Sequence, residues 1–178
     1  MIKTEKIVSF ELASKLKQIG YNQPCEGVYF RNKRNKIGWA LTPSPIQEHD
    51  CNSVETRENQ TSAPYYYDVN DWLLNTLGIK VLFYPSVYIN KGEEMIRYNE
   101  QGTDMLYEYS IGITPQAFRI NHNLAEFLMH CLYHEPDTLP MKPDTELGAF
   151  EQACTKICNI IIAFGNTMKM LKEIKGLK

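Results

Sequence analysis

The apolar residues near the start of the chain recur at helical spacing. Leu12, Leu16 and Ile19 are four and three residues apart, which places them on one face of a helix. Ser9 precedes this stripe and can accept a backbone N–H of the first turn. Gly20 follows it and tolerates the left-handed conformation in which helices often end. We therefore predict a helix that begins after Ser9 and ends before Gly20.

Residues 27–31 and 37–41 are short runs rich in aromatic and aliphatic side chains, which is typical of strands. The polar residues 32–36 between them suit a hairpin turn. Residues 42–63 then contain two prolines, several acids and few apolar side chains. We interpret them as a long surface loop, and loops of this length tend to be functional or mobile.

The middle of the chain changes from helical to strand-like spacing. A helical stripe over residues 64–77 starts with a proline, which suits a first helical turn, and stops at Gly78. Strand-like runs follow at 79–88, 95–98 and 105–113, and short turn signals separate them. In the last run apolar and polar residues alternate, as in a strand with one buried face.

A further helix is predicted from 121 to 135, and the proline-rich residues 135–144 form a stiff connector to a final helix. This order of elements predicts an α+β fold in which an antiparallel meander has helices packed on one face. We divide the chain into an α+β domain over residues 1–143 and a long C-terminal amphipathic helix over residues 144–178.

The apolar spacing is most regular in this final helix, where intervals of three and four alternate over more than three heptads. The residues of the stripe are Leu147, Phe150, Cys154, Ile157, Ile161, Phe164, Met168 and Leu171. Such a stripe is typical of a coiled-coil seam, so we predict that the chain self-associates through it. Packing of the helix on its own sheet uses similar spacings and is an equal alternative.

Composition and charge narrow the classes of protein without identifying one. Of the 178 residues, 43% are hydrophobic and 22% charged, which is ordinary for one globular domain. The formal net charge of −2 argues against a nucleic-acid partner, because dedicated nucleic-acid binders usually carry a basic excess. The basic stretch 31–36, flanked by Tyr29, Phe30 and Trp39, is therefore interpreted as a solvated hairpin tip.

The distribution of apolar residues and cysteines favours an intracellular protein. The N-terminal residues include no apolar segment of signal-peptide length, and no run approaches the ~20 apolar residues of a membrane span. The five cysteines are odd in number and lack the spacing of a disulfide framework. We expect a cytoplasmic location and no membrane partner.

One histidine pair and one cysteine pair have the spacing of metal ligands on helices. His130 and His134 are four residues apart, as are Cys154 and Cys158, so a structural zinc site between two helices is chemically feasible. Such pairs also arise by chance on amphipathic helices, and Cys154 lies in the apolar stripe, where a thiol packs as a small hydrophobe. We therefore expect no cofactor and retain structural zinc as an alternative.

The usual sequence signatures of enzymes do not occur in this chain. It has no phosphate-binding glycine loop and no nucleophile elbow. The paired carboxylates Asp68 and Asp71 are interpreted as residues that favour a helix start. The pattern favours a protein that is not an enzyme.

Five tyrosines stand out as candidate binding residues. Tyr65, Tyr66 and Tyr67 are consecutive at a predicted helix start, where their side chains point in three directions, so at least one should be exposed. Tyr84 and Tyr88 on the following strand could join them. Tyrosine is enriched in binding surfaces, and the competing interpretation is that these rings cover a sheet edge.

Five motifs occur together in this chain: the first helix with Gly20, Tyr21, Pro24 and Cys25, the helix start Ala63 and Pro64, the stripe Val69, Trp72 and Leu73, the strand entry 78–81 and the helix start 150–154. In this combination the chain resembles a group of short, uncharacterised phage, prophage and mobile-element proteins of gut bacteria that has no agreed function. The five motifs are structural, so the resemblance implies no catalytic residue.

We therefore expect a non-catalytic interaction protein of a phage or mobile element that acts in the host cytoplasm. Its expected partners are a second copy of itself and a host protein, a phage protein or a small signalling molecule, for example as an inhibitor of antiviral defence. One alternative is a virion or assembly component. A second is a metal-containing module or enzyme that uses the His and Cys pairs.

Overall fold

The computed structural model describes residues 6–31, 36–41, 60–99, 101–102, 104–134, 143 and 145–176. Most of the predicted turn at 32–36, of the predicted loop at 42–63 and of the predicted connector at 135–144 therefore lies outside the described residues. The side chains of His134 and Leu171 lie outside them as well.

Helices and antiparallel strands both contribute to the fold, and the predicted α+β class with its long C-terminal helix is confirmed. The elements are α1 (Phe10–Gln18), β1 (Gly27–Arg31), β2 (Ile37–Leu41), β3 (Gln60–Ala63), α2 (Tyr66–Trp72), the π-helix η2 (Leu73–Leu77), β4 (Ile79–Pro85), β5 (Val87–Asn90), β6 (Glu93–Ile96), β7 (Tyr107–Ile113), α3 (Pro115–His134) and α4 (Glu146–Gly176). The strands form three small sheets, β2-β1-β3, β4-β7 and β5-β6, instead of one continuous meander.

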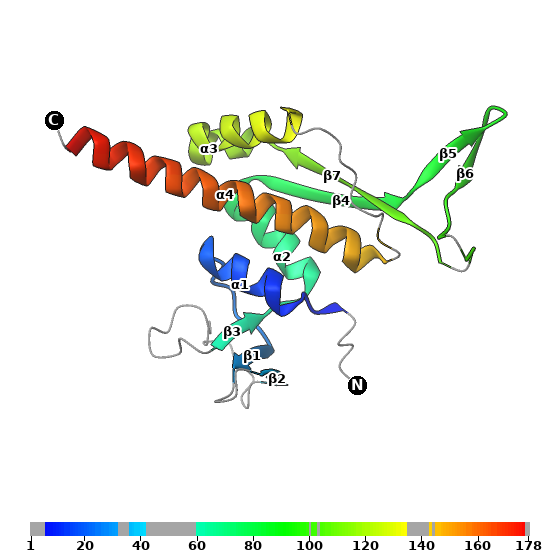
Figure 1. Cartoon of the computed structure of the whole chain (residues 1–178), viewed down its shortest axis with the longest axis horizontal. Helices are drawn as coiled ribbons and strands as arrows, with labels where there is room; N and C mark the ends of the chain where they lie inside the picture. The colour runs from blue at the N-terminus through cyan, green and yellow to red at the C-terminus, as the bar shows by residue number, and fades with distance from the viewer. Residues whose placement is uncertain are drawn as a thin grey trace.

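Helix α4 runs through the middle of the molecule (Figure 1). The β4–β7 pair and α3 lie on one side of it, and α1 and α2 lie on the other. Because elements cover both sides, the first half of α4 is apolar almost all round. Phe150, Cys154 and Ile157 are completely buried there, in the same core as Leu12 and Val81.

This burial places two residues of the predicted oligomer interface along α4 inside the fold, and self-association through the others stays a prediction. Phe150 and Ile157 have no exposed surface, so they stabilise the fold of this chain and are not available to a second copy. Leu147, Ile161 and Met168 are half-buried. Phe164 is also half-buried, and its ring packs on that of Phe127 with 5.4 Å between the ring centres. The alternative, in which the helix packs on its own domain, describes the first half of α4.

The ends of the first helix match the prediction. The Ser9 hydroxyl accepts a hydrogen bond from the Leu12 backbone N–H, and Gly20 has a φ of 92°. Two polar contacts then join α1 to α4. The Ser9 backbone N–H donates to the Glu151 carboxylate, and the Lys15 ammonium donates to the Asn159 side-chain oxygen over 2.7 Å.

Residues 60–63 correct the predicted loop, because they form strand β3. This strand pairs with β1 antiparallel, with Val28 opposite Ser62 and Gly27 opposite Ala63. Its sequence has no apolar alternation, so the pattern gave no strand signal. The pairing is decided by β1, which has β2 on one edge and accepts β3 on the other.

The predicted strand at 79–88 is interrupted at Ser86, which is completely buried. The Ser86 N–H donates to the Leu106 carbonyl over 2.7 Å, whereas the Ser86 carbonyl accepts from the Arg97 N–H over 2.8 Å. One residue therefore bonds to two different segments, and the chain passes from the β4–β7 pair into a separate β5–β6 hairpin. Figure 1 shows this hairpin projecting away from the rest of the molecule.

Candidate functional site

The three consecutive tyrosines divide between the core and the surface. The Tyr66 ring packs at 5.5 Å from the Phe150 ring and at 5.9 Å from the Phe83 ring. The Tyr65 and Tyr67 rings stack on each other with 5.3 Å between centres and 5° between planes, and Tyr67 is 46% exposed. The prediction that at least one ring is exposed is confirmed, and Tyr66 is half-buried against the core.

Acidic groups surround the stacked pair. The Tyr65 hydroxyl donates a hydrogen bond to Glu26 over 3.1 Å. Desolvation and then the carboxylates of Asp68 and Glu26 raise the pKa of Tyr67 above its ordinary value. The two hydroxyls therefore stay protonated at neutral pH, and this surface presents aromatic rings next to negative charge.

Tyr84 and Tyr88 do not join this cluster. Along β4, Ile79, Val81 and Phe83 face the core, so Tyr84 points to the opposite face and is 42% exposed. Tyr88 lies on β5, where the Arg97 guanidinium sits 5.6 Å from the centre of its ring. The five predicted tyrosines therefore do not form one cluster.

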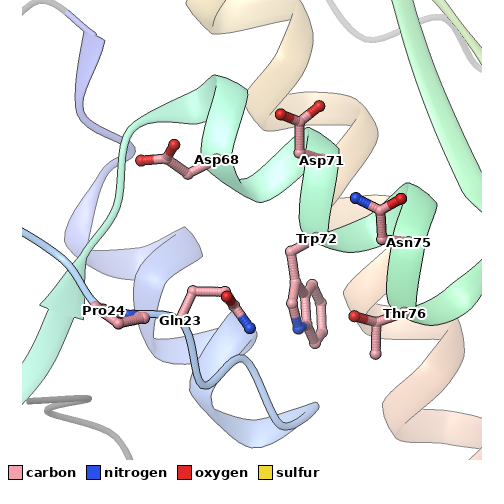
Figure 2. A pocket seen from close by; sticks show the side chains of 7 residues that line it. All are labelled: Gln23, Pro24, Asp68, Asp71, Trp72, Asn75 and Thr76. Atoms are coloured by element: carbon pink, nitrogen blue, oxygen red, sulfur yellow. The ribbon is translucent and has the colours of Figure 1, made fainter. Parts of the chain in front are cut away.

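A cavity of about 300 Å³ adjoins the acidic side of α2. The segment after α1 and the helical residues of α2 and η2 form its wall through the side chains of Gln23, Pro24, Asp68, Asp71, Trp72, Asn75 and Thr76. Figure 2 shows Trp72 between Gln23 and Thr76, with Asp68 and Asp71 along one edge. The sequence signal for this site was the pair of aspartates, which we interpreted only as helix-start residues.

The carboxylates of this cavity lack a compensating charge. Desolvation, followed by the charges of Asp71 and Glu26, raises the pKa of Asp68, and a hydrogen bond from the Tyr65 backbone N–H opposes that shift. The described part of the chain pairs neither Asp68 nor Asp71 with a cation. Asp68 retains its helix-start role, and the cavity has in addition an excess of negative charge.

The β5–β6 hairpin is the most exposed apolar structure among the described elements. All eight residues of its two strands are exposed. Ile89 is 76% exposed, Val87 is 45% exposed and Ile96 is 42% exposed. Soluble monomers rarely gather large apolar residues on one projecting element unless a partner covers them.

Pairing within the hairpin defines which backbone groups point outward. Lys91 and Gly92 form the two-residue turn with φ of 52° and 89°, as in a type I′ turn, so the closing pair Asn90 and Glu93 is hydrogen-bonded. Ile89 and Glu94 then form the next, non-bonded pair. The backbone N–H and C=O groups of Ile89 point to the outer edge of β5, and those of Glu94 to the outer edge of β6.

The predicted metal ligands do not form a cluster among the described residues, where no group of three or more His, Cys, Asp or Glu side chains could hold an ion. His130 is exposed on α3, whereas Cys154 and Cys158 are completely buried in the core. Burial raises the pKa of the Cys154 thiol well above its ordinary value and that of Cys158 to about 12. Both thiols are therefore protonated at neutral pH, and zinc binding by them stays a prediction.

Helix α4 is long and apolar enough to cross a membrane over Glu146–Met170, and it is the one such helix in the described part of the chain. Core helices of globular domains meet the same criteria. Its first half here is buried by α1, α3 and the β4–β7 pair, which accounts for its apolar character.

The comparisons with known proteins complete the description of the site. No protein-family model, no curated protein and no solved structure matches the chain. The resemblance to phage and mobile-element proteins therefore stays a prediction from sequence motifs.

Proposed function

We propose that this chain is a non-catalytic interaction protein that assembles with a second copy of itself through the outer edge of β5. The observation that carries the proposal is the projecting β5–β6 hairpin with its exposed apolar residues. A two-stranded hairpin is marginally stable in water, whereas a sheet of three or more strands is stable. Pairing of two hairpins would give a four-stranded sheet with the order β6-β5-β5-β6.

The charges on the two edges favour β5 as the contact strand. Monomeric proteins guard exposed edges with charged residues, prolines or bulges. Strand β5 (Val87–Asn90) contains no charged residue, whereas β6 begins with Glu93 and Glu94. Two β5 strands can therefore pair antiparallel around a two-fold axis without opposing like charges, and this symmetric arrangement is the commonest in homodimers.

The place and the final target of the assembly are a separate part of the proposal. The resemblance to phage and mobile-element proteins supports a role in the cytoplasm of a bacterial host. There the assembled protein would act on a host protein, a phage protein or a small signalling molecule.

Two proline substitutions test the β5 edge. Ile89→Pro removes an outward N–H of β5 without removing a hydrogen bond inside the hairpin, so we expect a monomer. Glu94→Pro makes the same change on the outer edge of β6 and serves as the matched control, for which we expect a dimer. Size-exclusion chromatography with light scattering measures the molecular mass of each variant. The protein concentration is varied from about 1 to 100 µM, which brackets typical micromolar affinities.

The outcomes separate self-association from other partners. A dimer lost with Ile89→Pro and retained with Glu94→Pro supports the proposal. A dimer lost only with Glu94→Pro would assign the contact to β6. A wild-type protein that stays monomeric over the whole range would reject self-association and leave the hairpin to a different protein.

A further inference from the structure

The cavity beside α2 combines three features that independently define the chemistry of a ligand. Its volume of about 300 Å³ is at the lower end of the range for small-molecule sites, so it suits a group of about the size of one amino acid. Two of its side chains are carboxylates, and others are amides or a hydroxyl. It is separate from the β5–β6 hairpin, so an occupant here would be a second interaction of the protein.

The electrostatic feature is an excess of negative charge. Asp68 and Asp71 lie close enough for Asp71 to disfavour the charged form of Asp68, and Glu26 adds to this effect. Neither aspartate has an ion-pair partner within the described part of the chain. A cation placed between them would remove this repulsion and gain charge-assisted hydrogen bonds.

The third feature is a hydrogen-bond donor without a partner among the described residues. Trp72 is only 5% exposed, and its ring packs edge-on to that of Tyr21 at 5.2 Å. The structure gives the indole N–H no hydrogen-bond partner among the described residues, although the side chain lines the cavity. In Figure 2 the indole nitrogen lies on the side of the ring that faces Gln23. The indole nitrogen keeps contact with solvent, and an occupant that supplies an acceptor would take the place of water as its partner.

We propose that the cavity of Asp68, Asp71 and Trp72 binds a small organic cation that carries an ammonium or guanidinium group together with a hydrogen-bond acceptor. The cationic group donates to the two carboxylates, and the acceptor receives the indole N–H. A free amine and the side chain of a lysine or arginine in a polypeptide share this chemistry. The site is a binding site, and no bond is made or broken in it.

The indole N–H of Trp72 reports directly on the occupant. The chain has two tryptophans, so Trp39→Phe identifies the Trp72 signal in a ¹H–¹⁵N spectrum. The probes are 4-aminobutanamide as the free amine that carries an acceptor, and Nα-acetyl-arginine amide and Nα-acetyl-lysine amide as blocked residues. Nα-acetyl-glutamine amide is the uncharged control, and sodium, magnesium and calcium chloride are the inorganic controls.

We expect the Trp72 indole signal to shift with the cationic probes and to saturate. A response to the blocked residues but not to 4-aminobutanamide would assign the site to polypeptide side chains, and the reverse would assign it to a free amine. Equal shifts with the glutamine derivative, or shifts with inorganic salts alone, would overturn the proposal. No shift with any organic cation would also overturn it.

Two matched variants test the role of charge in the cavity itself. Asp71→Asn removes a carboxylate from an exposed helical position, and we expect affinity for the cationic probes to fall at least about tenfold, as for the loss of a charge-assisted hydrogen bond. Glu11→Gln makes the same change of net charge on the exposed first turn of α1 and should leave affinity unchanged. Equal effects of the two variants would show that only overall charge matters.

Trp72→Phe keeps an aromatic ring but removes the N–H together with part of the ring system, so isothermal titration calorimetry measures the contribution of the indole as a whole. We expect the Trp72→Phe variant to bind the acetylated amides more weakly than the wild-type protein does. Binding that is unchanged in Trp72→Phe would contradict the acceptor part of the proposal. The outcome does not depend on whether the protein dimerises through β5, because the Ile89→Pro variant can be tested in the same way.

Discussion

Gly78 lies between η2 and β4, with a φ of 69°. A Cβ atom added there would lie 2.3 Å from the backbone nitrogen of Ala117. Gly20 also has a positive φ, of 92°, but nothing lies within 4 Å of an added Cβ atom. The two glycines therefore share a backbone conformation and differ in their surroundings, which makes them a matched pair for substitution.

We predict that Gly78→Ala is much more destabilising than Gly20→Ala. The left-handed backbone costs each alanine about 1–2 kcal/mol. At Gly78 the close contact with the start of α3 adds about 1–3 kcal/mol, because backbone must move to make room. Urea unfolding measures both free energies. Equal losses in the two variants would show that α3 does not pack on Gly78 as described.

The thiols of Cys154 and Cys158 face the core at the centre of α4. Burial is the main cause that raises the pKa of Cys158 from its ordinary value of 9.0 to about 12, and the nearby Lys15 opposes it. An unfolded chain would therefore lose this proton at a lower pH than the folded chain. The thiol links the stability of the core to alkaline pH.

We predict that the free energy of unfolding falls as the pH rises from about 9 to about 12. Below that window Cys158 is protonated in both states, so it contributes no pH dependence. Within it the folded state binds more protons, and stability falls by up to about 1.4 kcal/mol per pH unit. Denaturant unfolding at pH 8 and pH 10.5 measures the effect in the wild type and in Cys158→Ala. An equal fall in both proteins would rule out Cys158 as its source.

At the scale of elements, α4 has two halves with different surroundings. Phe150 is completely buried between α2 and the β4–β7 pair, whereas Met170 is 62% exposed near the end of the helix. The regular apolar stripe does not distinguish these halves, since its spacing continues through both. The difference follows from where α1, α3 and the β4–β7 pair stop along the helix (Figure 1).

We predict that Phe150→Ala lowers the free energy of unfolding by about 3–5 kcal/mol, as for loss of a large core side chain. Met170→Ala should change it by no more than about 0.5 kcal/mol. Both effects should be independent of protein concentration, because Phe150 packs within its own chain. A loss for Phe150→Ala that shrinks as the protein is concentrated would restore the idea of an interface along this part of α4.

At the scale of the whole molecule, the fold keeps its two candidate interaction sites apart. The hairpin projects beyond the end of the β4–β7 pair (Figure 1), whereas the cavity is lined by α2, η2 and the segment after α1 (Figure 2). The buried joint at Ser86 separates the hairpin from the core, and its hydroxyl also donates to Glu108 over 2.7 Å. Changes at the tip of the hairpin should therefore leave the cavity intact, and the two proposals can be tested independently.

Local structure was predictable where a few neighbouring residues decide it. The runs 27–31 and 37–41 coincide with β1 and β2, and Gly20 and Gly78 end their helices as expected. The final helix begins after Thr145, whose hydroxyl accepts from the Gly148 N–H over 3.0 Å. Capping and turn conformations depend on contacts within about four residues, which a sequence displays directly.

Strand β3 and the break at Ser86 were not predictable in the same way. Residues 60–63 have no apolar alternation, and they pair because β1 offers an open edge. The run around Ser86 is strand-like throughout, and only its bonds to Leu106 and Arg97 divide it. In both places a distant segment decides the structure, so the local pattern is not sufficient.

The sequence by itself determined the α+β class, the ends of most helices and the amphipathic character of α4, because these follow from backbone geometry and from apolar spacing. Only the tertiary structure decided which half of α4 is buried, that Tyr66 packs against the core, and that Asp68 and Asp71 share a cavity with Gln23. These features depend on which distant elements pack together. Packing partners are selected by the burial of the whole core, to which every segment contributes.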